Sequence, residues 1–283
     1  MEERQYCYTI KGLIAPIEET IFKNILIKGI YPSDQAKVYF KIQFSNQTEK
    51  KKIADGLPKR LEKIAQFYAL MTDRHVSISR SSASTHIDTQ CPFGWDKLGE
   101  GLTFIPIYSD EDRQKKVPEL QITLAKYHEL NSILESKKNS YLKNAIDYYY
   151  RSLEDGRLEK KLIDLMISLE SLFSKETNEL SLRYSLRASF FLSSKNINNR
   201  LEIYNDIRSL YNNRSKVVHG TGNVKLDYGE IKRFQNYLKE AIKIFLYIGK
   251  SKDQLLSLID HSIVDNGKLE QLNKIINKAI EKW

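Results

Sequence analysis

The spacing of hydrophobic residues changes near residue 130. Before that point apolar side chains alternate with polar ones, as in the run VYFKIQF over residues 38–44, and this alternation is typical of half-buried strands. After it they recur at every third or fourth position to the end of the chain, as in amphipathic helices. The pattern predicts an α+β fold in which a mostly-β domain over residues 1–128 precedes an all-α helical bundle over residues 129–283.

Individual elements follow from the same pattern. In the first part, besides residues 38–44, we expect strands at 6–10, 25–27, 75–79, 103–108 and 120–125, and a helix over Leu57–Met71. In the second part we expect helices over residues 131–153, 157–174, 179–193, 197–219, 228–249, 252–262 and 267–282. Ser251 and Asn266 are predicted N-caps, and the short connections predict antiparallel neighbours in a bundle.

The helix predicted over residues 197–219 carries the most informative pattern. Its apolar stripe consists of Ile203, Ile207, Leu210, Tyr211, Val217 and Val218. Arg214 falls within this stripe, where a permanently charged guanidinium needs an anionic partner. His219 follows five residues later, directly before Gly220, a residue type that commonly ends helices. The helix dipole favours imidazolium there, and the ring titrates near neutral pH, so one helix end offers a fixed cation and a proton carrier.

Glu170 is the predicted partner of Arg214. It lies at the edge of the apolar stripe of the helix over residues 157–174, where its carboxylate is expected to face the bundle interior. Two readings of these side chains stay open. Arg214 is either a phosphate-binding cation or a structural residue paired with Glu170, and His219 is either a proton donor and acceptor or a C-terminal cap favoured by the helix dipole.

Charge is distributed unevenly along the chain. Residues 1–130 carry 19 Lys and Arg against 17 Asp and Glu, a net of +2, whereas residues 131–283 carry 26 against 19, a net of +7. The basic excess therefore lies in the same half as Arg214, which fits an anionic partner such as RNA. An ordinary lysine-rich surface fits the charge count equally well.

Several other classes of protein do not fit the sequence. Cys7 and Cys91 stand far apart, which indicates a reduced, cytoplasmic protein. The polar N-terminus does not resemble a signal peptide, and no apolar run approaches a membrane span. The histidines outside the Arg214–His219 segment have no metal-ligand spacing, so neither a metal nor another cofactor is expected.

Three blocks follow one another within residues 145–222: AIDYYYRSLEDGRLEKKLIDLMISLESLF, LSLRYSLRASFFL and RLEIYNDIRSLYNNRSKVVHGTG. With these blocks in this order, the segment resembles an Apea-like HEPN domain. Arg214 and His219 match the Arg and His of the family's Arg-x4-His motif. Many active members have Asn, Asp or His directly after the Arg; here the residue is Ser215, as is common in Apea-like members, and it would take a supporting role with Glu170. Nothing is recognised in residues 1–125, although such domains often follow a separate N-terminal domain.

The resemblance implies a helical bundle that dimerises with its Arg-x4-His segments facing one another. Many members are metal-independent endoribonucleases, and several act in phage defence by abortive infection. On this basis His219 is expected to act as general base or acid, and Arg214 to stabilise the phosphoryl oxygens. Tyr211 and Lys216 are expected substrate contacts. The N-terminal domain would be a sensor or regulatory domain that meets a phage-derived trigger or a partner protein.

The chemistry agrees with a paired site. RNA supplies its own nucleophile, the 2′-OH, so cleavage needs a base, an acid and positive charge on the phosphorane, and leaves a 2′,3′-cyclic phosphate. One copy of the motif supplies one titratable group; a homodimer supplies two. The alternative is a catalytically silent HEPN protein that serves as an RNA-binding, protein-binding or dimerisation module.

Overall fold

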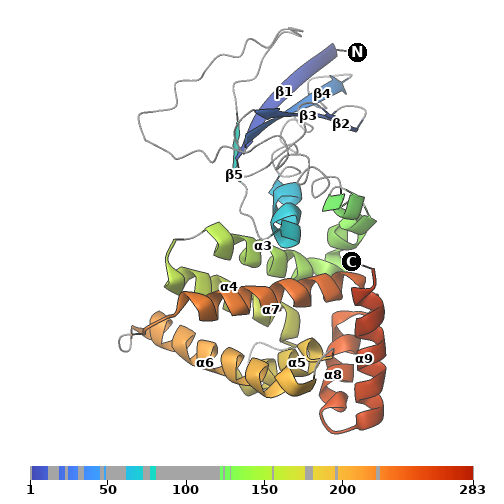
Figure 1. Cartoon of the computed structure of the whole chain (residues 1–283). Coiled ribbons are helices and arrows are strands. Elements are labelled where there is room, and N and C mark those ends of the chain that lie inside the picture. Colours follow the sequence, from blue (N-terminus) through green and yellow to red (C-terminus); the bar gives the residue numbers. More distant parts are fainter. Residues whose placement is uncertain are drawn as a thin grey trace. The chain divides into compact units, whose positions relative to one another are not determined.

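The chain divides into two compact units, residues 1–127 and 128–283. The computed structural model describes residues 2–11, 19–22, 25–30, 35–44, 48, 62–72, 77–80, 122–123, 125–127, 129–154, 156–175, 181–194, 197–220 and 224–282. Figure 1 shows the elements of both units.

The described part of the N-terminal unit contains one antiparallel sheet. Its strands are β1 (Glu2–Lys11), β2 (Glu19–Phe22), β3 (Ile25–Ile30), β4 (Gln35–Phe44) and β5 (Ser77–Arg80). Their order across the sheet is β2-β3-β4-β1-β5. The longest pairing joins β1 to β4, from Glu2 opposite Phe44 to Lys11 opposite Gln35. β5 pairs with β1 from Tyr8 to Lys11.

The predicted fold class, α+β with a mostly-β N-terminal domain, is wrong. Helix dominates the described chain. Within the N-terminal unit it occurs at residues 62–72, where a helix was predicted, and also at residues 122–123 and 125–127, where none was. Residues 120–125, predicted as a strand, are helical wherever the structure describes them. Alternation over so short a run does not separate strand from helix, and this run leads into a helical stretch at residues 129–135. The strand expected over 103–108 lies outside the described residues.

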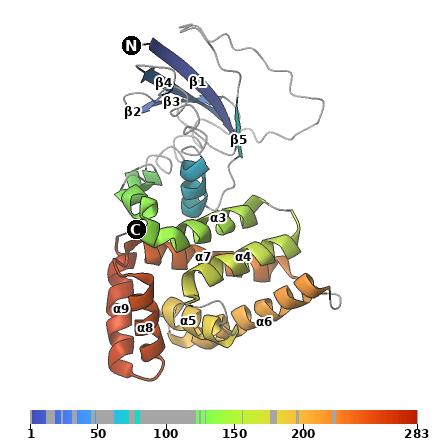
Figure 2. The same ribbon diagram turned by 180° about the vertical axis from the view of Figure 1, so that it is seen from behind.

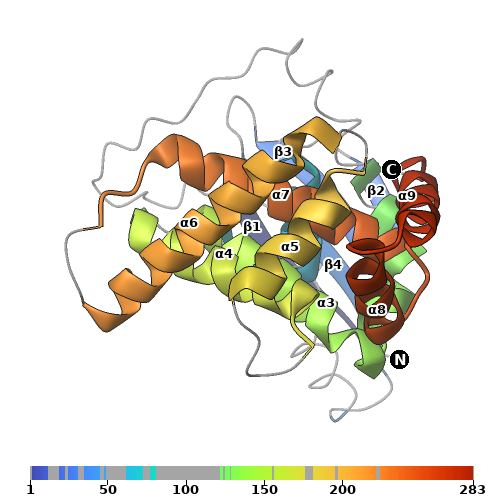
Figure 3. The same ribbon diagram turned by 90° about the horizontal axis from the view of Figure 1, so that it is seen from below.

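Every regular element that the structure describes in the second unit is a helix. After the short 3-10 helix η1 (Lys137–Asn139) come α3 (Ser140–Glu154), α4 (Leu158–Phe173), α5 (Ser181–Leu192), η2 (Ile197–Asn199), α6 (Arg200–His219), α7 (Tyr228–Tyr247), α8 (Lys252–Ser262) and α9 (Asn266–Ile280). Figures 1 and 2 show α3 beside α4 and α8 beside α9. Figure 3 shows α5 beside α6, with α6 crossing α4.

The core of this unit forms where α4, α5 and α7 meet. Phe173, Phe191 and Phe245 lie edge to face or tilted against one another, with ring centroids 4.9 to 5.5 Å apart. All three are buried, and each buried aromatic of this size stabilises the fold by roughly 1.5–3 kcal/mol through burial alone. This cluster fixes the C-terminal end of α4, the end that carries Glu170.

Helix ends agree with the sequence in part. Ser251 caps α8 as predicted: its Oγ accepts a hydrogen bond from the Gln254 N–H, and the Gln254 Oε1 accepts one from the Ser251 N–H. The predicted cap of α9, Asn266, is instead its first helical residue. Asp265 caps α9, because its carboxylate accepts hydrogen bonds from the backbone N–H groups of Gly267 and Lys268, at 2.7 and 3.1 Å.

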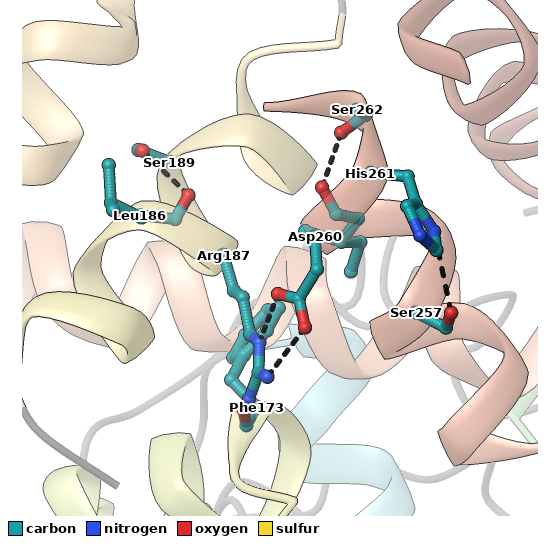
Figure 4. A network of polar contacts seen from close by, with 9 residues as sticks. Phe173, Leu186, Arg187, Ser189, Ser257, Asp260, His261 and Ser262 are labelled. Atoms are coloured by element: carbon teal, nitrogen blue, oxygen red, sulfur yellow. Dashed lines mark hydrogen bonds and ion pairs between the residues drawn. The ribbon is translucent and has the colours of Figure 1, made fainter. Parts of the chain in front are cut away.

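An ion pair between a buried arginine and a partly exposed aspartate joins α5, α8 and the end of α4. The side chain of Arg187, on α5, is only 1% exposed. Its Nε and Nη2 donate to the two carboxylate oxygens of Asp260, on α8, at 2.7 and 2.8 Å. Its Nη1 donates to the carbonyl oxygen of Phe173 at 2.7 Å, one of the carbonyls that the α-helix itself leaves without a partner. Figure 4 shows this guanidinium between the two helices.

Candidate functional site

The helix α6 is buried along its middle and emerges toward its C-terminal end. Ile203, Ile207 and Leu210 are buried, but the predicted stripe does not continue at that depth, since Val217 is half-buried and Val218 is 50% exposed. Neighbours on α4, α5 and α7 cover α6 but leave its last turns partly open. The residues of the Arg-x4-His motif occupy this emerging end.

Arg214 is half-buried, and its guanidinium has an unused donor. The Nε atom is buried and has no hydrogen-bond partner. Among the described residues no carboxylate lies within ion-pair distance of Arg214. A buried N–H without a partner costs about 1–3 kcal/mol, and such a group calls for an explanation in a folded protein. An anion that arrives at this position would supply the missing acceptor.

Glu170, on α4, interacts with Arg214 through its charge. The charge of Arg214 acts on the Glu170 carboxylate, and no ion pair within 4.0 Å joins them in the described residues. Burial raises the pKa of Glu170, and the nearby Arg214 cation offsets this only in part. The predicted pairing is therefore present as an electrostatic interaction rather than as a salt bridge.

His219 is the last residue of α6 and is exposed. Gly220 ends the helix with φ +64°, in the left-handed region, and its backbone N–H bonds to the Lys216 carbonyl. The sequence predicted this helix end correctly. Arg214 and His219 are five residues apart, so their side chains leave the helix axis in directions about 140° apart. The two side chains of one protomer therefore point to different sides of α6.

The remaining predicted residues surround Arg214 at different depths. Tyr211 is half-buried and packs against Tyr184 of α5, with ring centroids 6.1 Å apart. Ser215 is half-buried, next to Arg214 in the chain, and Lys216 is exposed. Thus Ser215 shares the partly covered side with Arg214, whereas Lys216 and His219 reach solvent.

A polar brace between α6 and α7 was not predicted. The Asp206 carboxylate, on α6, accepts a hydrogen bond from the Tyr237 hydroxyl at 3.0 Å and from Arg233 Nε at 3.4 Å. Burial, the hydrogen bond to Asp206 and its negative charge together raise the pKa of Tyr237. Arg233 and Tyr237 lie 27 and 31 residues from Asp206 in the chain, so the local sequence pattern does not predict these contacts. The sequence shows only that Asp206 lies about two helical turns before Arg214.

The described residues include no group of three or more His, Cys, Asp or Glu side chains placed to hold a metal ion. None of their helices has the length and apolar character needed to cross a membrane. Comparisons of the chain with protein-family models, with curated proteins and with solved structures find no match.

Proposed function

We propose that the chain is an HEPN-type, metal-independent endoribonuclease that cleaves RNA through a composite site made by two Arg-x4-His segments in a homodimer. The reaction is attack of the 2′-OH on the adjacent phosphate, which gives a 2′,3′-cyclic phosphate and a free 5′-OH. A role in phage defence follows from the family resemblance. The observation that carries the proposal is Arg214, whose buried Nε has no acceptor, on the helix that ends at an exposed histidine.

Each residue has a definite task in this reaction. Arg214 binds a nonbridging phosphate oxygen and stabilises the negative charge that grows on the phosphorane. His219 exchanges a proton with the 2′-OH or the departing 5′-oxygen, and an imidazole can do so near neutral pH. Exposure suits this task, because His219 has to meet the sugar-phosphate backbone of a long polymer.

The geometry of α6 favours a site shared between two protomers. One imidazole cannot be base and acid on opposite sides of a phosphate at the same moment, and the two side chains of one segment diverge. A second copy of the chain supplies the second imidazole and a second guanidinium. The exposed side chain of Val218, next to His219, leaves apolar surface available at this helix end.

The direct test is incubation of the purified full chain with RNA in the presence of EDTA. We expect internal cuts with 2′,3′-cyclic phosphate ends. Arg214→Ala and His219→Ala are each expected to lower the rate at least a hundredfold, in line with the contributions of phosphate-stabilising and proton-transfer groups. Arg208→Ala removes the same charge from an exposed position of the same helix and should cut like wild type.

Mixing an inactive variant with wild type tests the composite site. A dimer of one wild-type chain and one His219→Ala chain keeps a single imidazole at the shared site, so an excess of the variant should lower the activity of the wild-type chains. If Arg214→Ala and His219→Ala both cut as well as wild type, the catalytic assignment is wrong. If the variant exchanges subunits with wild type and the activity per wild-type chain does not fall, the site is not shared in this way.

A further inference from the structure

Glu170 and Arg214 form an incomplete pair at the crossing of α4 and α6. The two helices pack together (Figure 3), and the two side chains are each half-buried. They are close enough for one charge to act on the other, and too far apart for an ion pair. The guanidinium keeps an unused donor, and the carboxylate has given up part of its hydration without gaining a close cation.

Arg214 is the charged group that matters for Glu170. The helix α4 packs against α3, α5, α6 and α7, and within the described residues only Arg214, on α6, acts on this carboxylate with its charge. No titratable or charged side chain of α3, α5 or α7 in the described residues adds to that effect. Any event that occupies Arg214 therefore changes the electrostatic balance at Glu170.

A phosphate diester bound to Arg214 would change that balance in one direction. Its negative charge repels the Glu170 carboxylate, and it neutralises the cation that offsets the burial of this group. Both effects favour the protonated acid. We propose that Glu170 is a proton-linked positioning residue, whose carboxylate competes with the phosphate for Arg214 and takes up one proton when a phosphate diester binds there. The inference rests on the proposed function, since it takes Arg214 as the phosphate-binding group.

The balance of the step is simple. The carboxylate, one proton from solvent and the phosphate diester combine to give the neutral carboxylic acid beside an arginine–phosphate pair, and no covalent bond to phosphorus is made or broken. The carboxylate thereby discourages tight binding at high pH, and its charge is removed when a phosphate is present. A purely structural Glu170 would make no contribution to proton uptake on binding.

The test uses an RNA oligonucleotide in which every ribose is 2′-O-methylated, so that it binds without being cut. The full-length His219→Ala protein is the reference, because the imidazole also titrates near neutral pH. Binding is measured by fluorescence anisotropy between about pH 5 and pH 8, and by calorimetry in buffers of different ionisation heat. We expect uptake of up to one proton, so affinity should fall by as much as about tenfold for each pH unit.

Two second substitutions in this reference locate the proton. His219→Ala with Glu170→Gln should lose the uptake and show a flatter pH profile. His219→Ala with Glu159→Gln should keep both, since Glu159 is an exposed acid in the first turn of the same helix. Equal uptake in the reference and the Glu170→Gln protein would overturn the inference, as would no uptake in the reference.

Further outcomes separate this inference from the ribonuclease itself. If wild type cleaves RNA but binding causes no Glu170-dependent proton uptake, the ribonuclease proposal stands and the inference about Glu170 is wrong. If proton uptake depends on Glu170 but wild type never cuts RNA, the inference about Glu170 stands and the ribonuclease proposal is wrong. Oligonucleotide binding that is unchanged in Arg214→Ala would overturn the inference, because the phosphate would then be bound elsewhere.

Discussion

Two arginines of the helical unit differ in how completely their donors are used. Arg187 is buried, and its Nε, Nη1 and Nη2 all donate, to the Asp260 carboxylate and to the Phe173 carbonyl (Figure 4). Arg214 is half-buried, its Nε has no hydrogen-bond partner among the described residues, and Glu170, whose carboxylate interacts with its charge, forms no ion pair with it there. The fold itself supplies hydrogen-bond acceptors for the Arg187 guanidinium. The Arg214 guanidinium would need a bound anion to supply the acceptor that its Nε lacks.

This difference separates structural cations from candidate binding cations. A buried charge with a full set of partners resists change, because removing either partner strands the other. A guanidinium with an unused buried donor gains from a ligand what the fold does not provide. The two helices differ in the same way. The hydrogen bonds of Arg187 tie α5 to α8 and to the end of α4, whereas the C-terminal end of α6 is exposed.

The largest effect on stability is expected at the satisfied arginine. Asp260→Ala leaves the Arg187 guanidinium buried without its carboxylate, which should lower the free energy of unfolding by about 3–5 kcal/mol. Arg214→Ala should change it by less than about 1 kcal/mol, because no close ion pair is lost. Urea denaturation followed by helical circular dichroism measures both. Asp253→Ala, exposed on α8, is the control for loss of an acid; similar losses at Asp260 and Arg214 would abolish the distinction.

A second contrast lies along α6 itself. Ile207 is fully buried, so Ile207→Ala should cost about 2–5 kcal/mol. Val218 is 50% exposed, and Val218→Ala should cost no more than about 0.5 kcal/mol in the isolated protomer. The same urea experiment at low protein concentration compares them. A loss at Val218 as large as that at Ile207 would show that its surface is covered.

The end of α6 was predictable from local sequence. Gly220 follows a run with helical spacing, and a glycine in the left-handed conformation is the commonest way for a helix to end. Arg214 and His219 became candidates for the same reason, since both lie in one short segment, and their role stays a prediction. The middle of the stripe, at Ile203, Ile207 and Leu210, is buried as expected.

Contacts between side chains on different helices were not predictable from the sequence. Arg187 and Asp260 are 73 residues apart, and nothing in the spacing of either predicts the other. Glu170 was expected to pair with Arg214, but the distance between them depends on how α4 and α6 cross. At residues 120–125 a short alternating run was assigned as a strand, although its described residues are helical; neighbouring structure decides such runs.

The geometry at Gly220 gives a smaller and more specific effect. Its φ is +64°, and a Cβ added there would meet no atom within 4 Å, so Gly220→Ala should cost about 1–2 kcal/mol through backbone strain alone. Gly249 is a matched control, with φ +66° and equally open space. Both alanine variants should lose similar stability. Only Gly220→Ala should lose RNA cleavage as well, because it disturbs the turn that holds His219; equal activities would separate that turn from the site.

The smallest expected effect is a pH dependence at Glu170. Burial raises the pKa of this carboxyl in the folded protein, so Glu170 stabilises the fold fully below the pKa it has when unfolded, and this contribution is lost as pH rises through the folded pKa. Glu170→Gln removes that loss. The difference between the variant and wild type should therefore shift in favour of the variant as pH rises from about 4 to 7. Because the nearby Arg214 cation limits the shift, Arg214→Ala should enlarge it. Urea midpoints of wild type, Glu170→Gln, Arg214→Ala and the double variant measure both trends. If the stability difference between Glu170→Gln and wild type stays constant with pH, Glu170 titrates alike in the folded and unfolded chain.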